Sequence, residues 1–290
     1  METSIKNDFL SVKLKNAGAE LTSIKSIVDQ TEYLWQAHKD VWPRHAPVLF
    51  PIVGKVADNK YRFQDKEYSL GQHGFARDMD FVLVKSTDNS VCFLLESNEN
   101  TLQKYPFDFK FYIEYKLEGA TLITTYRVIN TGHQTMYFSV GGHPAFNCPL
   151  LTDETWADYD LIFEKTEPIR RYLIKDGLID HVAHPVELHQ NVLPLHTSLF
   201  SADAIVIKNM SSKSIILKSR KSGKFVQMDF DGFPFYGIWT KPGVEKFVCL
   251  EPWCGIADSV GFNGDLTQKE GINRLEIGKE FTASYRTIFG

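Results

Sequence analysis

The stretch that decides the fold is Phe107-Asp108-Phe109-Lys110-Phe111-Tyr112-Ile113-Glu114-Tyr115-Lys116-Leu117. Aromatic or aliphatic residues occupy every odd position, while the lysines and the acids fall on even positions. A period of two is typical of a β-strand with one buried and one solvated face, and it fits no helix. The stretch therefore predicts a half-buried strand.

The neighbouring segments continue this pattern. A β-rich run at 121–130 follows the short connection 118–120, so the two runs are predicted to form a hairpin. A turn signal at 220–223, Arg-Lys-Ser-Gly, separates two further β-rich runs, 214–219 and 224–230. Other short runs of this kind lie at 91–96, 204–208 and 281–288, the last of which is predicted to be a closing strand.

Helical periodicity is scarce along the chain. Residues 176–192 are polar and contain histidines, which predicts a loop with short turns. The sequence shows no Gly-, Ser- or Pro-rich linker, no low-complexity segment and no obvious repeat. We therefore predict an all-β fold with few short helices, a large antiparallel β-sandwich formed by one domain over residues 1–290.

The composition narrows the class of protein. The chain has 290 residues, of which 43% are hydrophobic, and a net charge of -4, which argues against a nucleic-acid partner. No apolar stretch approaches the roughly 18 residues of a membrane helix, and the first residues do not resemble a secretory signal. The four cysteines match no disulfide or metal-ligand spacing, which predicts reduced thiols in a cytoplasmic protein.

Two segments each place one proton-transferring side chain among apolar and turn-forming residues. Glu251 follows an apolar strand predicted at 247–250 and is expected to stand at its end, just before Pro252-Trp253. Desolvation by the indole would raise the pKa of a carboxylate at this strand end. His143 stands between Gly141-Gly142 and a proline, a rigid bend that gives the ring a defined aim. Taken singly, each residue also has a simpler interpretation: Glu251 as a solvated glutamate, and His143 as a histidine that only stabilises the bend. Together they suit a general base and a general acid.

A further set of residues suggests a polar ligand. His73 and Arg77 are four residues apart, which keeps them on one face in a helical turn or an extended segment. Arg44 and Lys55 add two more cations upstream. Cations that converge on a pocket suit a hydroxyl-rich or phosphorylated ligand. The alternative is that Arg77 forms a surface ion pair instead. Four aromatic residues are either core or a stacking surface for a sugar ring: Phe235, Tyr236, Trp239 and Trp253.

Other site classes find no support in the sequence. It contains no known glycine-rich nucleotide loop and no nucleophile elbow of the Gly-x-Ser-x-Gly type. The spacing of the four histidines between 181 and 196 matches no zinc pattern.

The order of these motifs resembles the galactose mutarotase (aldose 1-epimerase) superfamily over nearly the whole chain. The carrying segments are Ala17 to Leu21 (Ala-Gly-Ala-Glu-Leu), Arg44 with Pro47 to Pro51, His73 to Arg77 (His-Gly-Phe-Ala-Arg), Gly142-His143, Leu199 to Val206 with Asp203, and Leu250 to Trp253 (Leu-Glu-Pro-Trp). The chain is most similar to the LacX-like branch and shares features with hexose-6-phosphate epimerases. It departs from the galactose mutarotases around Gly142 to Phe146, where they often carry an Asn-His-Ser/Thr-Tyr-Phe segment.

The resemblance implies a large β-sandwich that interconverts the α and β anomers of a sugar without a metal or organic cofactor. It implies that Glu251 is the general base and that His143 is the general acid. It also implies that His73, Asp203, Arg44 and Arg77 contact the substrate. Lys55, in a segment that loosely matches a mutarotase Gly-Arg motif, competes with Arg44 for the cation role. Among the aromatic residues, Trp253 is the one expected at the site.

Two other functions remain open at this stage. One is a non-catalytic sugar-binding or regulatory protein on the same fold, because a fold does not determine a function. The other is cleavage of a different linkage by Asp203 and Glu251, since glycosidases use two carboxylates, but this leaves His143 without a role. The expected partner is a small sugar or sugar phosphate, and no nucleic acid or membrane is expected to bind. The chain is expected to be a monomer or a homodimer.

Overall fold

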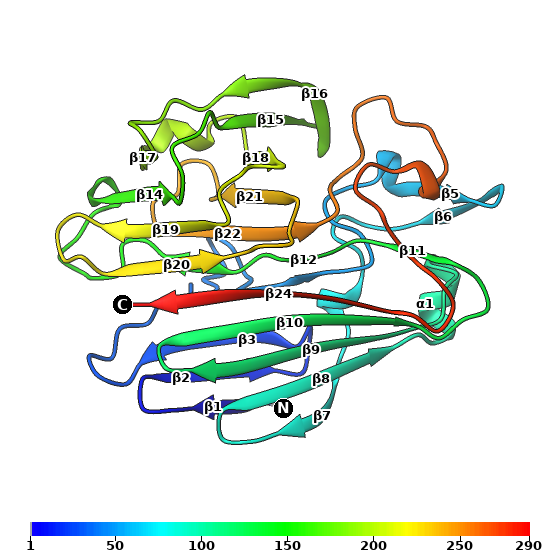
Figure 1. Cartoon of the computed structure of the whole chain (residues 1–290), viewed down its shortest axis with the longest axis horizontal. Coiled ribbons are helices and arrows are strands. Elements are labelled where there is room, and N and C mark those ends of the chain that lie inside the picture. Colours follow the sequence, from blue (N-terminus) through cyan, green and yellow to red (C-terminus); the bar gives the residue numbers. More distant parts are fainter. Residues whose placement is uncertain (1) are drawn as a thin grey trace.

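The computed structural model describes residues 2–290, whose strands form five sheets (Figure 1). The largest sheet has nine strands, in the order β17 (Val192–Pro194), β14 (Tyr159–Phe163), β19 (Ser214–Ser219), β20 (Phe225–Asp229), β24 (Glu280–Phe289), β10 (Thr121–Asn130), β9 (Phe109–Glu118), β8 (Ser90–Glu96) and β7 (Val82–Ser86). The second has eight strands, in the order β16 (Leu178–Pro185), β15 (Arg170–Lys175), β18 (Ile205–Lys208), β21 (Phe235–Trp239), β22 (Phe247–Cys254), β12 (Val140–Gly142) and β4 (Val48–Leu49), with β13 (Ala145–Asn147) also on β22.

Three smaller sheets and a few short helices complete the described chain. The sheets are β1 (Glu2–Lys6) with β2 (Leu10–Lys15) and β3 (Glu20–Ser26), β5 (Lys60–Phe63) with β6 (Lys66–Ser69), and β11 (Met136–Phe138) with β23 (Asn273–Leu275). The helices are α1 (Glu99–Lys104) and the 3-10 turns η1 (Ala57–Asn59), η2 (Ala76–Asp78), η3 (Trp156–Asp158), η4 (Thr197–Phe200) and η5 (Leu266–Gln268). Among residues 2–290, no helix has the length and apolar character needed to cross a bilayer.

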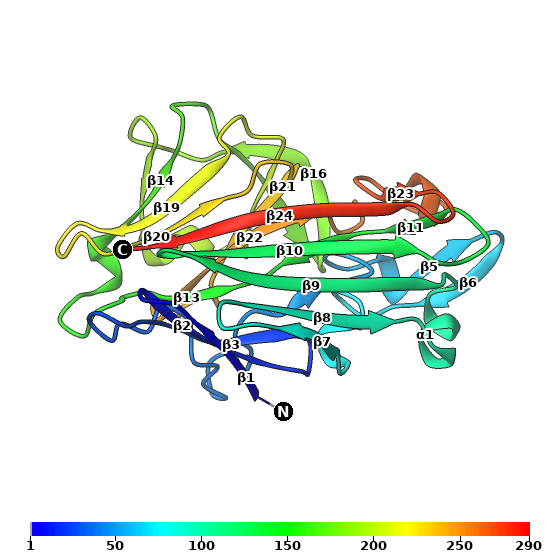
Figure 2. The ribbon, with the colours of Figure 1, turned by 60° about the horizontal axis from the view of Figure 1, so that its bottom comes forward.

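The predicted hairpin is confirmed as the pair β9 and β10, which lies between β24 and β8 in the nine-stranded sheet (Figure 2). Glu118 pairs with Thr121, so Gly119 and Ala120 form a two-residue turn. Gly119 has φ +57°, as the first position of a type II′ hairpin turn requires. The odd-numbered residues of β9 are buried and the even-numbered ones face outward, as their alternation predicts.

The two large sheets pack face to face around an aromatic core. The ring of Phe50, just after β4, stacks on Phe111 of β9 at 4.5 Å between centroids. A Cβ atom on Gly142 of β12 would lie 2.9 Å from the hydroxyl oxygens of Tyr126 and Tyr285, which belong to β10 and β24. The predicted antiparallel β-sandwich with few short helices is therefore confirmed. One domain over residues 1–290 stays a prediction.

One prediction about secondary structure is wrong. Residues 178–185, expected within a loop, form β16 at the edge of the eight-stranded sheet, paired with β15. Ile179 is the one fully buried residue of this strand. An edge strand that is exposed on most sides needs no alternation of apolar residues, so its polar sequence gives no strand signal.

Close packing of Trp253 on the flanking strands fixes the centre of the eight-stranded sheet. A Cβ atom on Gly237 of β21 would lie 2.5 Å from Trp253 ring carbons, and one on Gly141 of β12 would lie 2.7 Å from the same indole. Both neighbours must therefore lack a side chain for the buried indole to lie across them.

We expect Gly237→Ala to lower the free energy of unfolding by about 1–3 kcal/mol, because the added methyl group overpacks a buried ring. Urea unfolding measures this difference. Gly71→Ala is the matched control, since a Cβ there meets nothing within 4 Å and should leave stability unchanged. Equal stability of the two variants would contradict the packing described for Trp253.

Candidate active site

A cavity of about 290 Å³ opens on the eight-stranded sheet and collects most of the predicted site residues. Its lining includes Arg44, His73, Arg77, His143, Asp203, Glu251 and Trp253. Lys55 is the exception, because its Nζ donates to the carbonyl oxygen of Asp176 at 3.1 Å and its side chain does not line this cavity. Of the two competing upstream cations, Arg44 is thus the one that faces the cavity.

The catalytic candidates face each other because a strand is interrupted opposite a continuous one. Figure 1 shows β22 between β21 and β12. Gly141 of β12 pairs with Trp253, and Ala145 of β13 pairs with Cys249. The register along β22 is the same on both sides of the break, which places His143 opposite Glu251.

This arrangement corrects the expectation that Glu251 ends a strand. β22 continues through Pro252 to Cys254, so Glu251 lies inside a central strand and is 1% exposed. A proline has no backbone N–H to donate to a neighbouring strand. Pro252 is tolerated in β22 because the facing strand is interrupted here, where Pro144 likewise has no N–H to donate. The alternative of a solvated glutamate is therefore wrong.

The two side chains form a buried pair. His143 Nε2 lies 3.3 Å from Glu251 Oε2, and His143 is 8% exposed. Burial raises the pKa of Glu251 well above its usual value and lowers the pKa of His143 to about 3. Within residues 2–290, His143 Nδ1 has no hydrogen-bond partner and Glu251 Oε2 has no polar contact besides His143 Nε2, so both atoms can accept a further contact from a ligand.

Aromatic rings enclose His143 on two sides. Trp42 stacks on the imidazole at 5.1 Å between centroids and an angle of 25°, and Trp239 meets it edge-on at 5.6 Å. The sequence left undecided whether Trp239 belongs to the core or to the site, and in the structure it lines the cavity. The sequence gives no separate reason to expect Trp42, although it stands two residues before Arg44. These rings exclude water from the imidazole and present apolar faces to a ligand.

His73 is held as a hydrogen-bond donor. The backbone N–H of Gly54 donates to His73 Nδ1 at 3.1 Å, so the proton of a neutral ring sits on Nε2. Burial, and then the nearby His143, lower the pKa of His73 well below its usual value, which keeps the ring neutral. His73 has φ +66°, a strained backbone that is held by the bond from its N–H to the Gly54 carbonyl at 2.7 Å.

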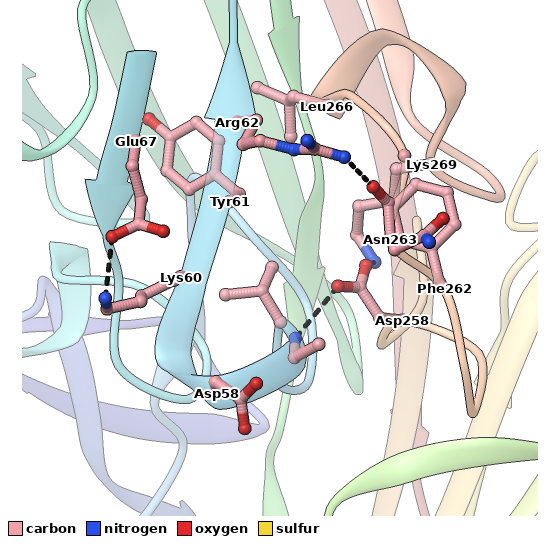
Figure 3. Close-up of a pocket in the computed structure, with 13 residues that line it drawn as sticks. Asp58, Lys60, Tyr61, Arg62, Glu67, Asp258, Phe262, Asn263, Leu266 and Lys269 are labelled. Atoms are coloured by element: carbon pink, nitrogen blue, oxygen red, sulfur yellow. Dashed lines mark hydrogen bonds and ion pairs between the residues drawn. The ribbon is translucent and has the colours of Figure 1, made fainter. Parts of the chain in front are cut away.

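A buried ion pair supports the segment that carries Gly54. Lys269 Nζ lies 2.7 Å from Asp258 Oδ1, with side chains 1% and 4% exposed, and Asp258 Oδ2 accepts the N–H of Ala57 (Figure 3). The backbone N–H of Asp258 also donates to the carbonyl oxygen of Lys55. Asp258 therefore fixes the chain that follows Gly54 against the chain that follows β22.

The same aspartate lines a second cavity of about 400 Å³, shown in Figure 3. Its other charged groups are mostly paired with one another or with backbone. Lys60 Nζ contacts Glu67 at 2.6 Å, and Arg62 donates to the carbonyl oxygen of Asn263. We therefore place the candidate chemistry in the first cavity, where buried polar atoms lack partners.

The two arginines share one aspartate. Arg44 Nη2 lies 2.8 Å from Asp78 Oδ1, and Arg77 Nε lies 3.7 Å from Asp78 Oδ2. Arg77 Nη2 also donates to the carbonyl oxygen of Gln72 at 2.8 Å. The expected alternative of an ion pair for Arg77 is thus present, yet Arg77 still lines the cavity. One net positive charge remains at this end of the site.

Buried Glu20, in the Ala-Gly-Ala-Glu-Leu segment, holds the chain just after Arg44. Its Oε1 accepts the backbone N–H groups of His45 and Ala46 at 2.8 and 3.0 Å, and Lys15 Nζ lies 2.5 Å from its Oε2. This segment also contacts Arg77, since a Cβ on Gly18 would lie 2.8 Å from the Arg77 carbonyl oxygen. The N-terminal segment therefore positions both arginines without lining the cavity.

Comparison with known proteins identifies the family and the fold of the chain. Residues 1–270 match the family model described as aldose 1-epimerase. A Lactococcus lactis protein, "Protein LacX, chromosomal", is 38% identical over 284 residues, which cover 95% of each chain. The X-ray structure of a galactose mutarotase related enzyme from Lactobacillus acidophilus matches with TM-score 0.96 and 37% identity, covering 100% of this chain and 97% of that one. A galactose mutarotase-like protein from Lactobacillus casei matches with TM-score 0.93 and 31% identity, covering 100% of both. The expected resemblance is confirmed.

We expect Glu20→Ala to destabilise the protein by about 1.5–3 kcal/mol, because it leaves two backbone N–H groups without their charged acceptor. Denaturant unfolding measures the loss. Glu67→Ala, which removes an exposed ion pair with Lys60, is the control and should cost at most about 1 kcal/mol. A Glu20→Ala variant as stable as this control would show that the carboxylate does not hold the Arg44 segment.

Proposed function

The chain belongs to the aldose 1-epimerase family, and we propose that it is an active epimerase that interconverts the α and β anomers of an aldohexose. The observation that carries the proposal is the buried pair of Glu251 and His143, 3.3 Å apart on the wall of a cavity of sugar size. A module that only binds sugar has no need for an acid and a base with opposite pKa shifts.

The reaction moves one proton across the substrate. Glu251 as carboxylate takes the proton of the C1 hydroxyl while His143 as imidazolium protonates the ring oxygen, so that the bond between C1 and the ring oxygen breaks. Rotation about the C1–C2 bond turns the free aldehyde over. The ring then closes on the other face, as His143 removes the hydroxyl proton and Glu251 returns a proton to the former carbonyl oxygen.

The pair needs only one exchangeable proton to do this. The neutral pair, a carboxylic acid beside an imidazole, carries the same number of protons as the ion pair of carboxylate and imidazolium. Burial favours the neutral form, as the raised pKa of Glu251 and the lowered pKa of His143 indicate. The ion pair that starts ring opening is then a strong base beside a strong acid, and the neutral pair is the form present with the open aldehyde.

The remaining lining groups orient the sugar. His73 donates from Nε2, Asp203 accepts from hydroxyl groups, and the indole N–H of Trp253 is a buried donor without a partner within residues 2–290. Asp78 neutralises one of the two arginine charges, which favours a neutral hexose. The second candidate is a hexose phosphate, favoured by the presence of two guanidinium groups on one cavity.

We expect the purified protein to accelerate anomer exchange, and Glu251→Gln and His143→Gln each to lower kcat/KM by roughly 10²–10⁴-fold. Exchange NMR on galactose, glucose and their 6-phosphates measures this and identifies the class of sugar. Glu67→Gln is the control for the removal of a carboxylate and should keep wild-type activity. Saturable binding of a sugar without faster exchange would instead support a non-catalytic sugar-binding protein.

The pH dependence of the free enzyme follows from the shared proton. We expect kcat/KM to stay level from about pH 5 to 8, without an inflection near the ordinary histidine pKa of about 6.5. Activity falls only when the pair gains a second proton, toward the lowered pKa of His143 at about 3, or loses its last one at high pH, because the pKa of Glu251 is raised. A pH series of exchange rates, corrected for the uncatalysed reaction, tests this, and a clear inflection between pH 6 and 7 would contradict it.

A further inference from the structure

A cysteine thiol lies beside the candidate catalytic pair. Ligand atoms of His143, Cys249 and Glu251 all lie within 4.8 Å of one another, and all three residues are buried. Cys249 and Glu251 are two residues apart on β22, so their side chains share one face of the strand, and His143 faces them from the break between β12 and β13. The proposed reaction gives the thiol no role.

The spacing of these atoms suits a tetrahedral zinc ion. Zinc lies about 2.0–2.3 Å from nitrogen, oxygen and sulfur ligands, so two ligands at the tetrahedral angle are roughly 3.3–3.6 Å apart. His143 Nε2 and Glu251 Oε2 already have this separation, at 3.3 Å. The thiol reaches the same separation by a side-chain shift of about 1 Å or more, within the range of a cysteine rotamer change.

The charges also balance at this buried position. A carboxylate, a thiolate and a neutral imidazole together carry two negative charges, which one Zn²⁺ neutralises, so the loaded site has no net charge to solvate. Glu251 Oε2 has no polar contact in residues 2–290 other than the one with His143 Nε2, at a residue that is 1% exposed. A cation that binds both atoms satisfies this buried oxygen.

We propose that Zn²⁺ binds to His143, Cys249 and Glu251 and reversibly inhibits the enzyme. The ion takes its fourth ligand, a water molecule or a sugar hydroxyl, from the cavity. Binding removes two protons, one from the Cys249 thiol and the one shared by the Glu251–His143 pair. The metal occupies both the base and the acid, so ring opening stops until the metal leaves. The inhibitory effect rests on the proposed function, whereas metal binding does not.

Calorimetric titration of the metal-free full-length protein with Zn²⁺, in two buffers of different ionisation enthalpy, tests the site. We expect one ion per chain and the release of about two protons. Cys249→Ala should weaken binding by about 100-fold or more and restore activity in the presence of Zn²⁺, while keeping wild-type activity without it. Cys254→Ala, which removes another buried thiol of β22, is the matched control and should bind like the wild type.

A second readout does not depend on catalysis or on the stability of one variant. Co²⁺ in place of Zn²⁺ should give a thiolate-to-metal charge-transfer band that is lost in Cys249→Ala, and Cys249→Ser should lose the band as well. Unchanged Zn²⁺ affinity in Cys249→Ala, or the absence of binding at one ion per chain, overturns the proposal. Zinc binding with these features in a protein that does not accelerate anomer exchange would leave the site intact and refute only the proposed function.

Discussion

The break between β12 and β13, opposite the uninterrupted β22, is the constraint on which the site depends. A continuous neighbour would fill the space over Glu251 with another backbone-paired residue. Instead the chain opens at His143 and Pro144, and the same register resumes at Ala145, so an imidazole occupies the position that faces the carboxylate. Because Glu251 lies on β22 and His143 lies between β12 and β13, which both pair with β22, their separation of 3.3 Å is set by sheet geometry. Sites built on regular elements are held more accurately than sites on loops.

Burial gives this pair its chemistry. Desolvation raises the pKa of the Glu251 carboxyl group and lowers the pKa of the His143 imidazole, and each shift favours the neutral form of its side chain. A single buried charge would be costly, but here one proton satisfies two groups, and its transfer between them leaves the net charge of the site unchanged. Ring opening requires the same exchange, carried through a substrate that accepts a proton at one oxygen and gives one up at another. The apolar rings of Trp42 and Trp239 maintain the desolvation on which this depends.

The sequence predicted most of this structure where the pattern is local. The alternation at 107–117 and the following glycine identify the central hairpin, and the motifs around Glu251 and His143 identify the pair. The continuation of β22 through Pro252 was not predictable from its own residues, because a proline normally argues against a central strand. The reason it is tolerated lies in the distant segment around Pro144. The choice between Arg44 and Lys55 likewise depends on tertiary contacts, and edge strand β16 carries no alternation to reveal it.

The buried charged residues outside the cavity stabilise loops rather than strands. Glu20 and Asp258 do not contact the catalytic pair. Glu20 binds the backbone that follows Arg44, and Asp258 binds the backbone that follows Gly54, which fixes the tautomer of His73. Glu251 needs no such clamp because it lies within β22, and His143 is held by the paired strands β12 and β13 on either side of it. Arg44 and His73 lie on loops, whose backbone groups have no ladder partners, and a buried carboxylate supplies a missing acceptor near each of them. It follows that a change in these loops can move Arg44 or His73 while Glu251 and His143 keep their geometry.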